Sequence, residues 1–187
     1  MQKSRNSFEE NGFLFSPVTD FTVFTGFSCL SPSDTDRDLD DFIRNDAERH
    51  SLDKIAITYA LCIEDNPFDP IGFVTLQNDA IVINSSKDLP EVTSYPYKAF
   101  PAVKIGRLGI RYDLQGNRFG TLMLSIVKEM MVTENRTGCR FITVDARRDK
   151  KNKINVTKFY AKNGFSLLPA RPKTSSYIPM YFDLANI

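Results

Sequence analysis

The sequence predicts an α/β (α+β) protein, in which a single mixed, mostly antiparallel twisted sheet is flanked by helices. Two apolar runs rich in β-branched residues, Ile55–Ile63 and Ile71–Leu76, are joined by a connector of turn residues and predict an antiparallel hairpin. Later runs alternate with helical patterns, which predicts strand–helix–strand units. The chain has 187 residues, so we expect a single domain over 1–187, with residues 1–15 as a loose N-terminal arm.

The first helix is expected at Asp38–His50, with Asp34 or Asp36 as its cap. Its apolar residues recur at helical spacing: Leu39, Phe42, Ile43 and Ala47. After the hairpin, Ala80–Asn84 either prolongs the second strand or forms a short strand of its own. The segment Ser85–Tyr97 contains two prolines and little pattern, which predicts a loop.

The second half of the chain contains the strongest helical pattern, Phe119–Thr133, whose apolar residues form one broad face. We expect strands at Val103–Ile110, Arg140–Val144, Phe165–Leu168 and Tyr177–Leu184, a charged loop at Asp145–Lys153, and a helix at Ile154–Asn163 ended by Gly164.

Composition narrows the class of protein. No apolar run is long enough for a membrane helix, and the N-terminus has no export-signal pattern. The three cysteines are scattered without metal-ligand spacing, so we expect free thiols, no metal site and a cytoplasmic protein. The net charge of +1 is unevenly spread, since residues 136–162 hold 9 basic and 2 acidic side chains. That segment is either a solvated surface or a contact for a phosphate-bearing partner.

The segment Leu114–Thr121 (LQGNRFGT) lies where a strand ends and the long helix begins. Such a junction favours anions, because the first helical N–H groups have no partners and the helix dipole attracts negative charge. Gly116 and Gly120 allow the backbone to turn sharply and approach phosphate oxygens. The segment is neither a Walker loop nor the GxGxxG dinucleotide fingerprint.

This segment resembles the pyrophosphate loop of the GNAT superfamily of N-acetyltransferases, Gln/Arg-x-x-Gly-x-Gly/Ala. Gln115 and Gly120 match its first and last positions, whereas Arg118 replaces the middle glycine. An arginine fits that position if the site does not need a positive φ. The downstream segment Phe159–Phe165 (FYAKNGF) resembles a second GNAT motif, and the order of the elements agrees over residues 20–184.

The resemblance implies acetyl-CoA as the cofactor and a set of site residues. The backbone of Leu108, Gly109 and Ile110 is expected to hold the pantetheine arm and polarise the thioester carbonyl. Tyr160 is expected to be the general acid that protonates the CoA thiolate. The cofactor loop is expected to consist of Gln115, Gly116, Asn117, Arg118, Phe119, Gly120 and Thr121. Asn155 is expected near the cofactor, with Asn152 competing for the role and helix capping as the alternative for both.

The amine acceptor is not identified by the sequence. Many GNAT enzymes have a glutamate on the strand before the loop, but Lys104 and Arg107 occupy that strand here, and His50 is expected at the surface. The segment Ala99–Ile110 also resembles the GNAT toxins of bacterial toxin–antitoxin pairs, which acetylate aminoacyl-tRNA. The predicted function is therefore direct acetyl transfer to a primary amine, with tRNA as a partner in the toxin-like case. A non-catalytic acyl-CoA-binding module and a homodimer are left open.

Overall fold

A computed structural model describes residues 8–10, 12–31, 36–85, 88–135, 137–149, 154–172, 174 and 176–187. The strands follow the order β1-β2-β3-β4-β5-β6-β9-β8 in one sheet, and β7 pairs with β6. The pairs β1–β2, β2–β3, β3–β4, β6–β7, β6–β9 and β8–β9 are antiparallel, and β5–β6 is parallel, so the predicted mixed sheet is confirmed. The chain forms two compact units, Met1–Gln77 with Gly106–Met130, and Asn78–Ile105 with Met131–Ile187. The expectation of one domain stays a prediction.

The first unit begins with two short strands, β1 (Phe8–Glu10) and β2 (Phe13–Pro17). The expected loose arm over 1–15 is therefore wrong from Phe8 onwards. The reason is that β2 pairs antiparallel with β3, with Phe15 opposite Leu61, and the Phe15 side chain is fully buried. Burial of a whole phenylalanine outweighs the polar composition of the neighbouring residues.

The predicted hairpin is formed by β3 (Ile57–Ile63) and β4 (Asn66–Val82). The connector is shorter than expected, because β4 already begins at Asn66 and continues through Pro67 and Pro70. Register shifts around Cys62 accommodate this proline-containing stretch. The strand also runs on to Val82, so Ala80 and its neighbours prolong β4 rather than form a separate strand.

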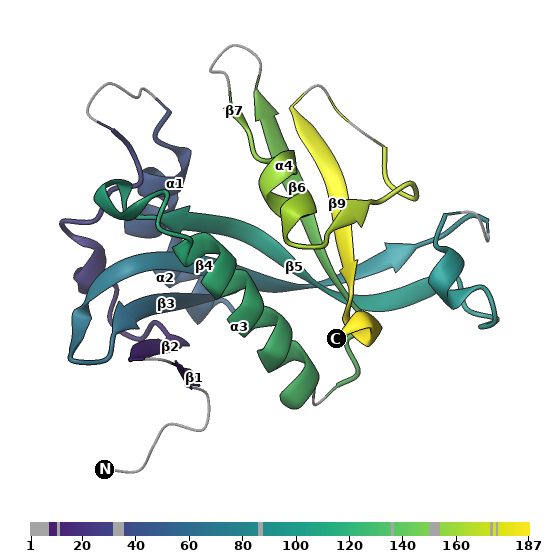
Figure 1. Ribbon diagram of the computed structural model, residues 1–187, viewed down its shortest axis with the longest axis horizontal. Helices are drawn as coiled ribbons and strands as arrows, with labels where there is room; N and C mark the ends of the chain where they lie inside the picture. Colours follow the sequence, from purple (N-terminus) through teal and green to yellow (C-terminus); the bar gives the residue numbers. More distant parts are fainter. Residues whose placement is uncertain are drawn as a thin grey trace. The chain divides into compact units, whose positions relative to one another are not determined.

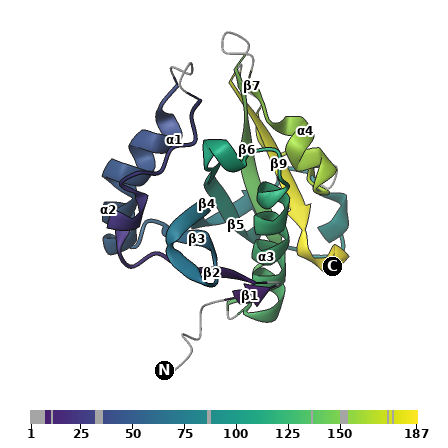
Figure 2. The same cartoon turned by 60° about the vertical axis from the view of Figure 1, so that its left-hand side comes forward.

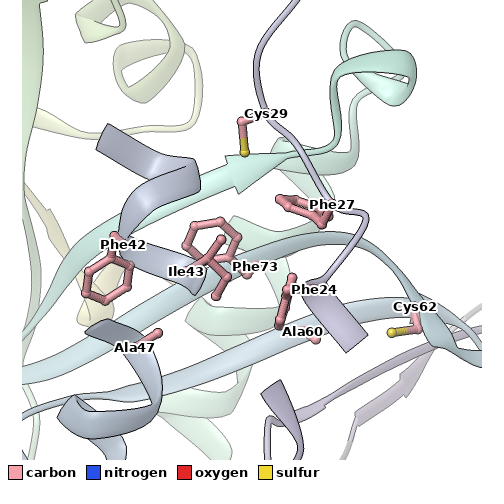
Figure 3. Close-up of a cluster of buried hydrophobic side chains, with 9 residues drawn as sticks. All are labelled: Phe24, Phe27, Cys29, Phe42, Ile43, Ala47, Ala60, Cys62 and Phe73. Atoms are coloured by element: carbon pink, nitrogen blue, oxygen red, sulfur yellow. The ribbon is translucent and has the colours of Figure 1, made fainter. Parts of the chain in front are cut away.

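The expected helix at Asp38–His50 is present as three joined segments, α1 (Asp38–Asp41), a π-helical turn η2 (Phe42–Asp46) and α2 (Ala47–Leu52). Asp36 accepts a hydrogen bond from the Asp38 amide at 3.3 Å, whereas Asp34 lies outside the described residues. Nine buried residues form the core beneath this segment, as Figure 3 shows. They are Phe24, Phe27, Cys29, Phe42, Ile43, Ala47, Ala60, Cys62 and Phe73.

The other face of the same strands carries helix α3 (Phe119–Thr133), which follows β5 (Ala99–Ile110) and matches the predicted helix at both ends (Figures 1 and 2). A Cβ built on Gly72 would lie 2.6 Å from the Gly109 carbonyl oxygen and 3.2 Å from the Met123 sulfur. Gly72 therefore allows β4, β5 and α3 to approach closely.

Gly109 is similarly crowded, on the face of β5 that packs against the aromatic core. We expect Gly109→Ala to lower the free energy of unfolding by about 1–3 kcal/mol, because its Cβ would lie 2.6 Å from the Cys29 sulfur and 2.8 Å from the Phe73 ring. Chemical denaturation measures this loss. The double variant with Cys29→Ala should recover part of it, because one of the two clashes is removed; equal losses in both backgrounds would contradict this account.

The second unit contains the first part of β5, then β6 (Phe141–Asp149), β9 (Tyr177–Asp183) and β8 (Ser166–Leu167). The charged loop predicted at Asp145–Lys153 is wrong up to Asp149, because β6 continues along β9 and then pairs with β7 (Ile154–Asn155). The predicted helix at Ile154–Asn163 is shorter and begins later, as α4 (Thr157–Lys162). Gly164 follows it with a φ of 82°, as a C-terminal cap requires.

A separate core holds the second unit together. It consists of Ile81, Ile83, Leu89, Val92, Phe100, Ala102, Phe141, Leu168 and Tyr181. The segment expected to be a loop at Ser85–Tyr97 supplies Leu89 and Val92, the latter from a short 3₁₀ turn, η3 (Pro90–Val92). None of the helices in the described ranges is long and apolar enough to cross a membrane.

Candidate functional site

The segment between β5 and α3 has an unusual backbone. A 3₁₀ turn, η4 (Tyr112–Leu114), leads into it, and Gly116 and Arg118 then adopt left-handed conformations with φ of 83° and 65°. Left-handed residues alternating with ordinary ones turn successive N–H groups toward one side of the chain, which makes a concave nest for anions. The 15 residues of α3 follow directly, so the helix dipole points its positive end at the same place.

The amides of this segment are free to bind a ligand. The backbone N–H groups of Leu114 and Gln115 donate to the carbonyl oxygens of Arg111 and Tyr112. The next backbone N–H group along the chain that has an acceptor is that of Leu122, which donates to the Arg118 carbonyl at 3.0 Å. Between them, the N–H groups of residues 116–121 have no acceptor among the described residues. A Cβ built on Gly116 would meet nothing within 4 Å, so a ligand can reach the backbone there. This arrangement fits a pyrophosphate group.

Side chains brace the same segment rather than point toward a ligand. The Gln115 amide donates to the carbonyl oxygens of Cys29 (2.7 Å) and Ile110 (3.1 Å). The Asn117 amide donates to the Leu114 carbonyl at 3.1 Å. Gln115 and Asn117 therefore hold the shape of the nest.

Arg118 occupies the left-handed conformation that the missing glycine would adopt easily. The condition under which an arginine was expected to fit, a site that needs no positive φ, is therefore not met. A non-glycine residue in this region costs roughly 1–2 kcal/mol, and such strain is often kept at ligand sites.

We expect Arg118→Gly to raise the free energy of unfolding by up to about 1 kcal/mol, because the relieved strain exceeds the added entropy of the unfolded chain. Thermal or chemical denaturation measures this change. Arg118→Ala, which keeps the Cβ, is the matched control and should bring no such gain. A Gly variant no more stable than the Ala variant would argue against strain at this position.

The strand residues that precede the loop are only partly covered. Pairing between β5 and β6 extends over Ala102–Ile105. The segment Leu108–Ile110 lies beyond that pairing, and Leu108 and Ile110 are half-buried while Gly109 is buried. At the C-terminal end of the strand, Arg111 donates its amide to the Ile71 carbonyl at 2.8 Å, which fixes β5 against β4. The end of the strand is therefore attached on the β4 side.

Tyr160 lies on α4 in the second unit, between two aromatic neighbours. The ring centroids of Phe159 and Phe165 are 5.1 and 5.3 Å from its own. Burial raises the pKa of Tyr160 above its usual value. Its hydroxyl forms no hydrogen bond to any other described residue. A neutral, protonated tyrosine is the form that a general acid needs.

The remaining candidate residues have structural roles or lie outside the described part. Asn155 precedes Val156, the N-cap of α4, and accepts hydrogen bonds from the backbone and hydroxyl of Thr157 at 3.2 and 2.6 Å, so it satisfies the first amide of the helix. Asn152 lies outside the described residues. The His50 ring packs against Phe42 with centroids 5.4 Å apart, and Lys104 forms an ion pair with Asp145 at 2.5 Å.

Sequence reasoning missed the link between the loop and the first helical segment. Asp40 is almost completely buried and accepts hydrogen bonds from the Cys29 amide at 2.7 Å and from the Ser28 hydroxyl. The Ser28 carbonyl accepts from the Tyr112 amide at 2.9 Å. Asp40 therefore fixes residues 28 and 29, whose carbonyl groups accept hydrogen bonds from the Tyr112 amide in η4 and from the Gln115 side chain. The sequence alone does not distinguish one buried aspartate within a segment that contains several aspartates, so the role of Asp40 could not be predicted.

Comparisons with known proteins identify solved structures of similar fold. No protein-family model and no curated protein matches the sequence. A tyrosine-to-phenylalanine mutant of KacT is similar in structure, with a TM-score of 0.71, 21% identity, and 94% of this chain and 97% of that chain covered. AtaT complexed with acetyl-methionyl-tRNAfMet matches with a TM-score of 0.67, 21% identity, and 93% and 96% covered. AtaTR bound with AcCoA matches at 0.65, 21%, and 95% and 96%. These likenesses confirm the predicted GNAT fold.

Proposed function

We propose that the protein is an N-acetyltransferase that binds acetyl-CoA and transfers its acetyl group to a primary amine. The observation that carries the proposal is the nest of free amides at residues 116–121, at the positive end of a 15-residue helix. Unbonded N–H groups at a helix N-terminus suit the two negative phosphates of CoA. The similar structure of AtaTR with AcCoA bound adds support from the same fold. No group of His, Cys, Asp and Glu side chains in the described ranges is arranged to hold a metal ion.

The reaction needs a neutral amine, a polarised carbonyl and a proton for the leaving sulfur. The amine nitrogen attacks the thioester carbon, the C–N bond forms, the C–S bond breaks, and the amine proton passes to water. In the proposal, backbone N–H groups of Leu108–Ile110 polarise the carbonyl, and Tyr160 gives its proton to the departing thiolate and then regains one from solvent. The raised pKa of Tyr160 keeps that proton in place at neutral pH. A non-catalytic acyl-CoA-binding module has no use for such an acid.

We further propose the α-amine of an aminoacyl-tRNA as the acceptor. AtaT has been solved with acetyl-methionyl-tRNAfMet, the product of such a transfer. An α-amine next to an ester has a low pKa and is partly neutral at pH 7, so it needs no strong base. This agrees with Lys104 and Arg107 standing on the strand where a glutamate base is common in GNAT enzymes. The similar bacterial toxin structures favour a bacterial cytoplasmic protein.

The test is transfer of radiolabelled acetyl-CoA to a fractionated bacterial lysate that contains charged tRNA. Label in the RNA pool that is lost on mild base treatment, which cleaves aminoacyl esters, supports the tRNA acceptor. Label confined to protein or small molecules keeps the acetyltransferase and overturns the tRNA acceptor. Acetyl-CoA binding by calorimetry with no label in any pool overturns catalysis and favours the binding module.

A further inference from the structure

Two exposed tyrosines lie together in the second unit, on the segment that joins β4 to β5 (teal in Figure 1). Tyr95 and Tyr97 have 53% and 64% of their surface exposed. Their ring centroids lie 6.5 Å apart and the ring planes differ by 18°, so the two rings are nearly parallel. Single exposed apolar residues are ordinary, whereas a pair of aligned aromatic rings marks a candidate contact surface.

The core of the second unit holds this pair in place. Val92 is buried in that core, and its carbonyl accepts a hydrogen bond from the Tyr95 amide at 3.0 Å. The Tyr95 ring packs edge-to-face against the buried Phe100 ring, with centroids 6.4 Å apart. Beyond the pair, the Lys98 carbonyl accepts a hydrogen bond from the Ile83 amide at 2.8 Å. The rings are therefore exposed but fixed, which lowers the entropy lost when a flat ligand stacks on them.

The acidic side chains of the same segment are engaged in hydrogen bonds, whereas its lysine is open to a partner. Asp88 accepts from two backbone amides at 2.8 and 2.9 Å, and Glu91 accepts from the Tyr181 hydroxyl at 2.6 Å. Lys98 directly follows Tyr97 and is exposed. The ion pairs between described residues do not include it. A positive charge beside the rings is thus open to an anionic partner.

The two units carry opposite charge. Residues 78–105 and 131–187 hold 14 basic and 7 acidic side chains, whereas residues 1–77 and 106–130 hold 10 basic and 16 acidic ones. A basic surface with exposed aromatic rings is typical of proteins that bind single-stranded RNA, because phosphates neutralise the charge and unpaired bases stack on the rings. A second copy of this chain would bring the same positive charge to the same place, which disfavours self-association there.

We propose that Tyr95 and Tyr97 form a platform on which unpaired bases of the tRNA stack, while Lys98 contacts the phosphate backbone beside them. The identity of the RNA rests on the proposed aminoacyl-tRNA acceptor, whereas the platform itself requires only unpaired nucleotides. Every base has a flat face, so the platform binds RNA without reading its sequence. It adds affinity for the RNA at a distance from the acetyl transfer and takes no part in the chemistry.

The test measures the RNA affinity of the whole protein by fluorescence anisotropy, with uncharged tRNA, an unstructured single-stranded RNA and a blunt RNA duplex as probes. We expect Tyr97→Leu to raise the Kd for tRNA and single-stranded RNA by about fivefold to a hundredfold, because a stacked base is lost, and to leave the Kd for the duplex unchanged. Tyr97→Phe keeps the ring and should bind as wild type does. Phe68→Leu removes a ring that is 77% exposed in the acidic unit, and this matched control should change no affinity.

Salt dependence separates the contribution of the ring from that of the charge. Tyr97→Leu should raise the Kd by the same factor at every salt concentration, because a stacked ring releases no counterions. Lys98→Gln should instead reduce the slope of log Kd against log salt concentration by about one, as expected for the loss of one phosphate contact.

Three results would overturn the platform. They are a wild type that binds none of the RNA probes, a Tyr97→Leu variant that binds tRNA as tightly as wild type, and an equal loss of duplex and single-strand binding in that variant. A Tyr97→Leu variant that changes only the oligomeric state, seen by sedimentation, would assign the rings to a contact between copies instead. Acetyl transfer to small amines with no RNA binding leaves the acetyltransferase and removes the platform. Stacking of RNA without acetyl transfer to any acceptor leaves the platform and removes the acetyltransferase.

Discussion

Gly120→Glu is expected to abolish acetyl-CoA binding while the protein remains at least as stable as wild type. Gly120 is the second residue of α3, within the run of free amides, and its φ is not positive, so a side chain can be built there without backbone strain. A carboxylate beside the pyrophosphate repels it, and like charges in contact cost several kcal/mol, so the Kd should rise by at least about a hundredfold. Isothermal titration calorimetry measures this change.

The same substitution should favour the free protein. A negative charge at a helix N-terminus is stabilising, and glutamate is a better helix former than glycine, so the free energy of unfolding should increase by about 1 kcal/mol. Gly120→Gln adds nearly the same volume without charge and should weaken binding much less. A Gly120→Glu protein that is folded and binds acetyl-CoA as tightly as wild type would refute the placement of the cofactor at this loop.

The sequence predicted the helix after the loop well because its signals are local. The helical periodicity of Phe119–Thr133 and the glycines before it depend only on neighbouring residues, and the structure confirms the helix at both ends. The β3–β4 hairpin was likewise predicted from two apolar runs, and the pairing of the two strands confirms it. Turn chemistry and periodicity therefore sufficed where the chain interacts with itself over short distances.

The errors arose where distant segments decide the structure. The N-terminal residues appear polar and loose, yet Phe15 is buried because β2 finds a partner in β3. The charged residues 145–149 extend β6 because β9 and β7 pair with it. The strain at Arg118 and the role of Asp40 depend on backbone angles and burial, which residue types alone do not reveal.

Tyr160→Phe is expected to lower kcat by about a hundredfold or more while acetyl-CoA affinity stays nearly unchanged. Only the hydroxyl is removed, and general acid catalysis typically contributes at least about that factor. The ring contacts with Phe159 and Phe165 persist in the variant. Steady-state kinetics and calorimetry together test the role. A variant with wild-type turnover would remove Tyr160 from the mechanism, and one that loses acetyl-CoA binding would show that its hydroxyl belongs to the binding site instead.

The pH dependence of stability gives an independent check on the state of this tyrosine. Burial raises the pKa of Tyr160 in the folded protein, whereas in the unfolded chain it titrates near its usual value of about 10. Above about pH 10 the unfolded state therefore loses a proton that the folded state keeps, and wild type loses stability as the pH rises further. Phenylalanine has no proton to lose. The stability of Tyr160→Phe relative to wild type should thus be constant from pH 6 to about 9 and increase above about pH 10. A flat difference across that range would mean that the hydroxyl ionises as easily in the fold as in water, so burial would not raise its pKa.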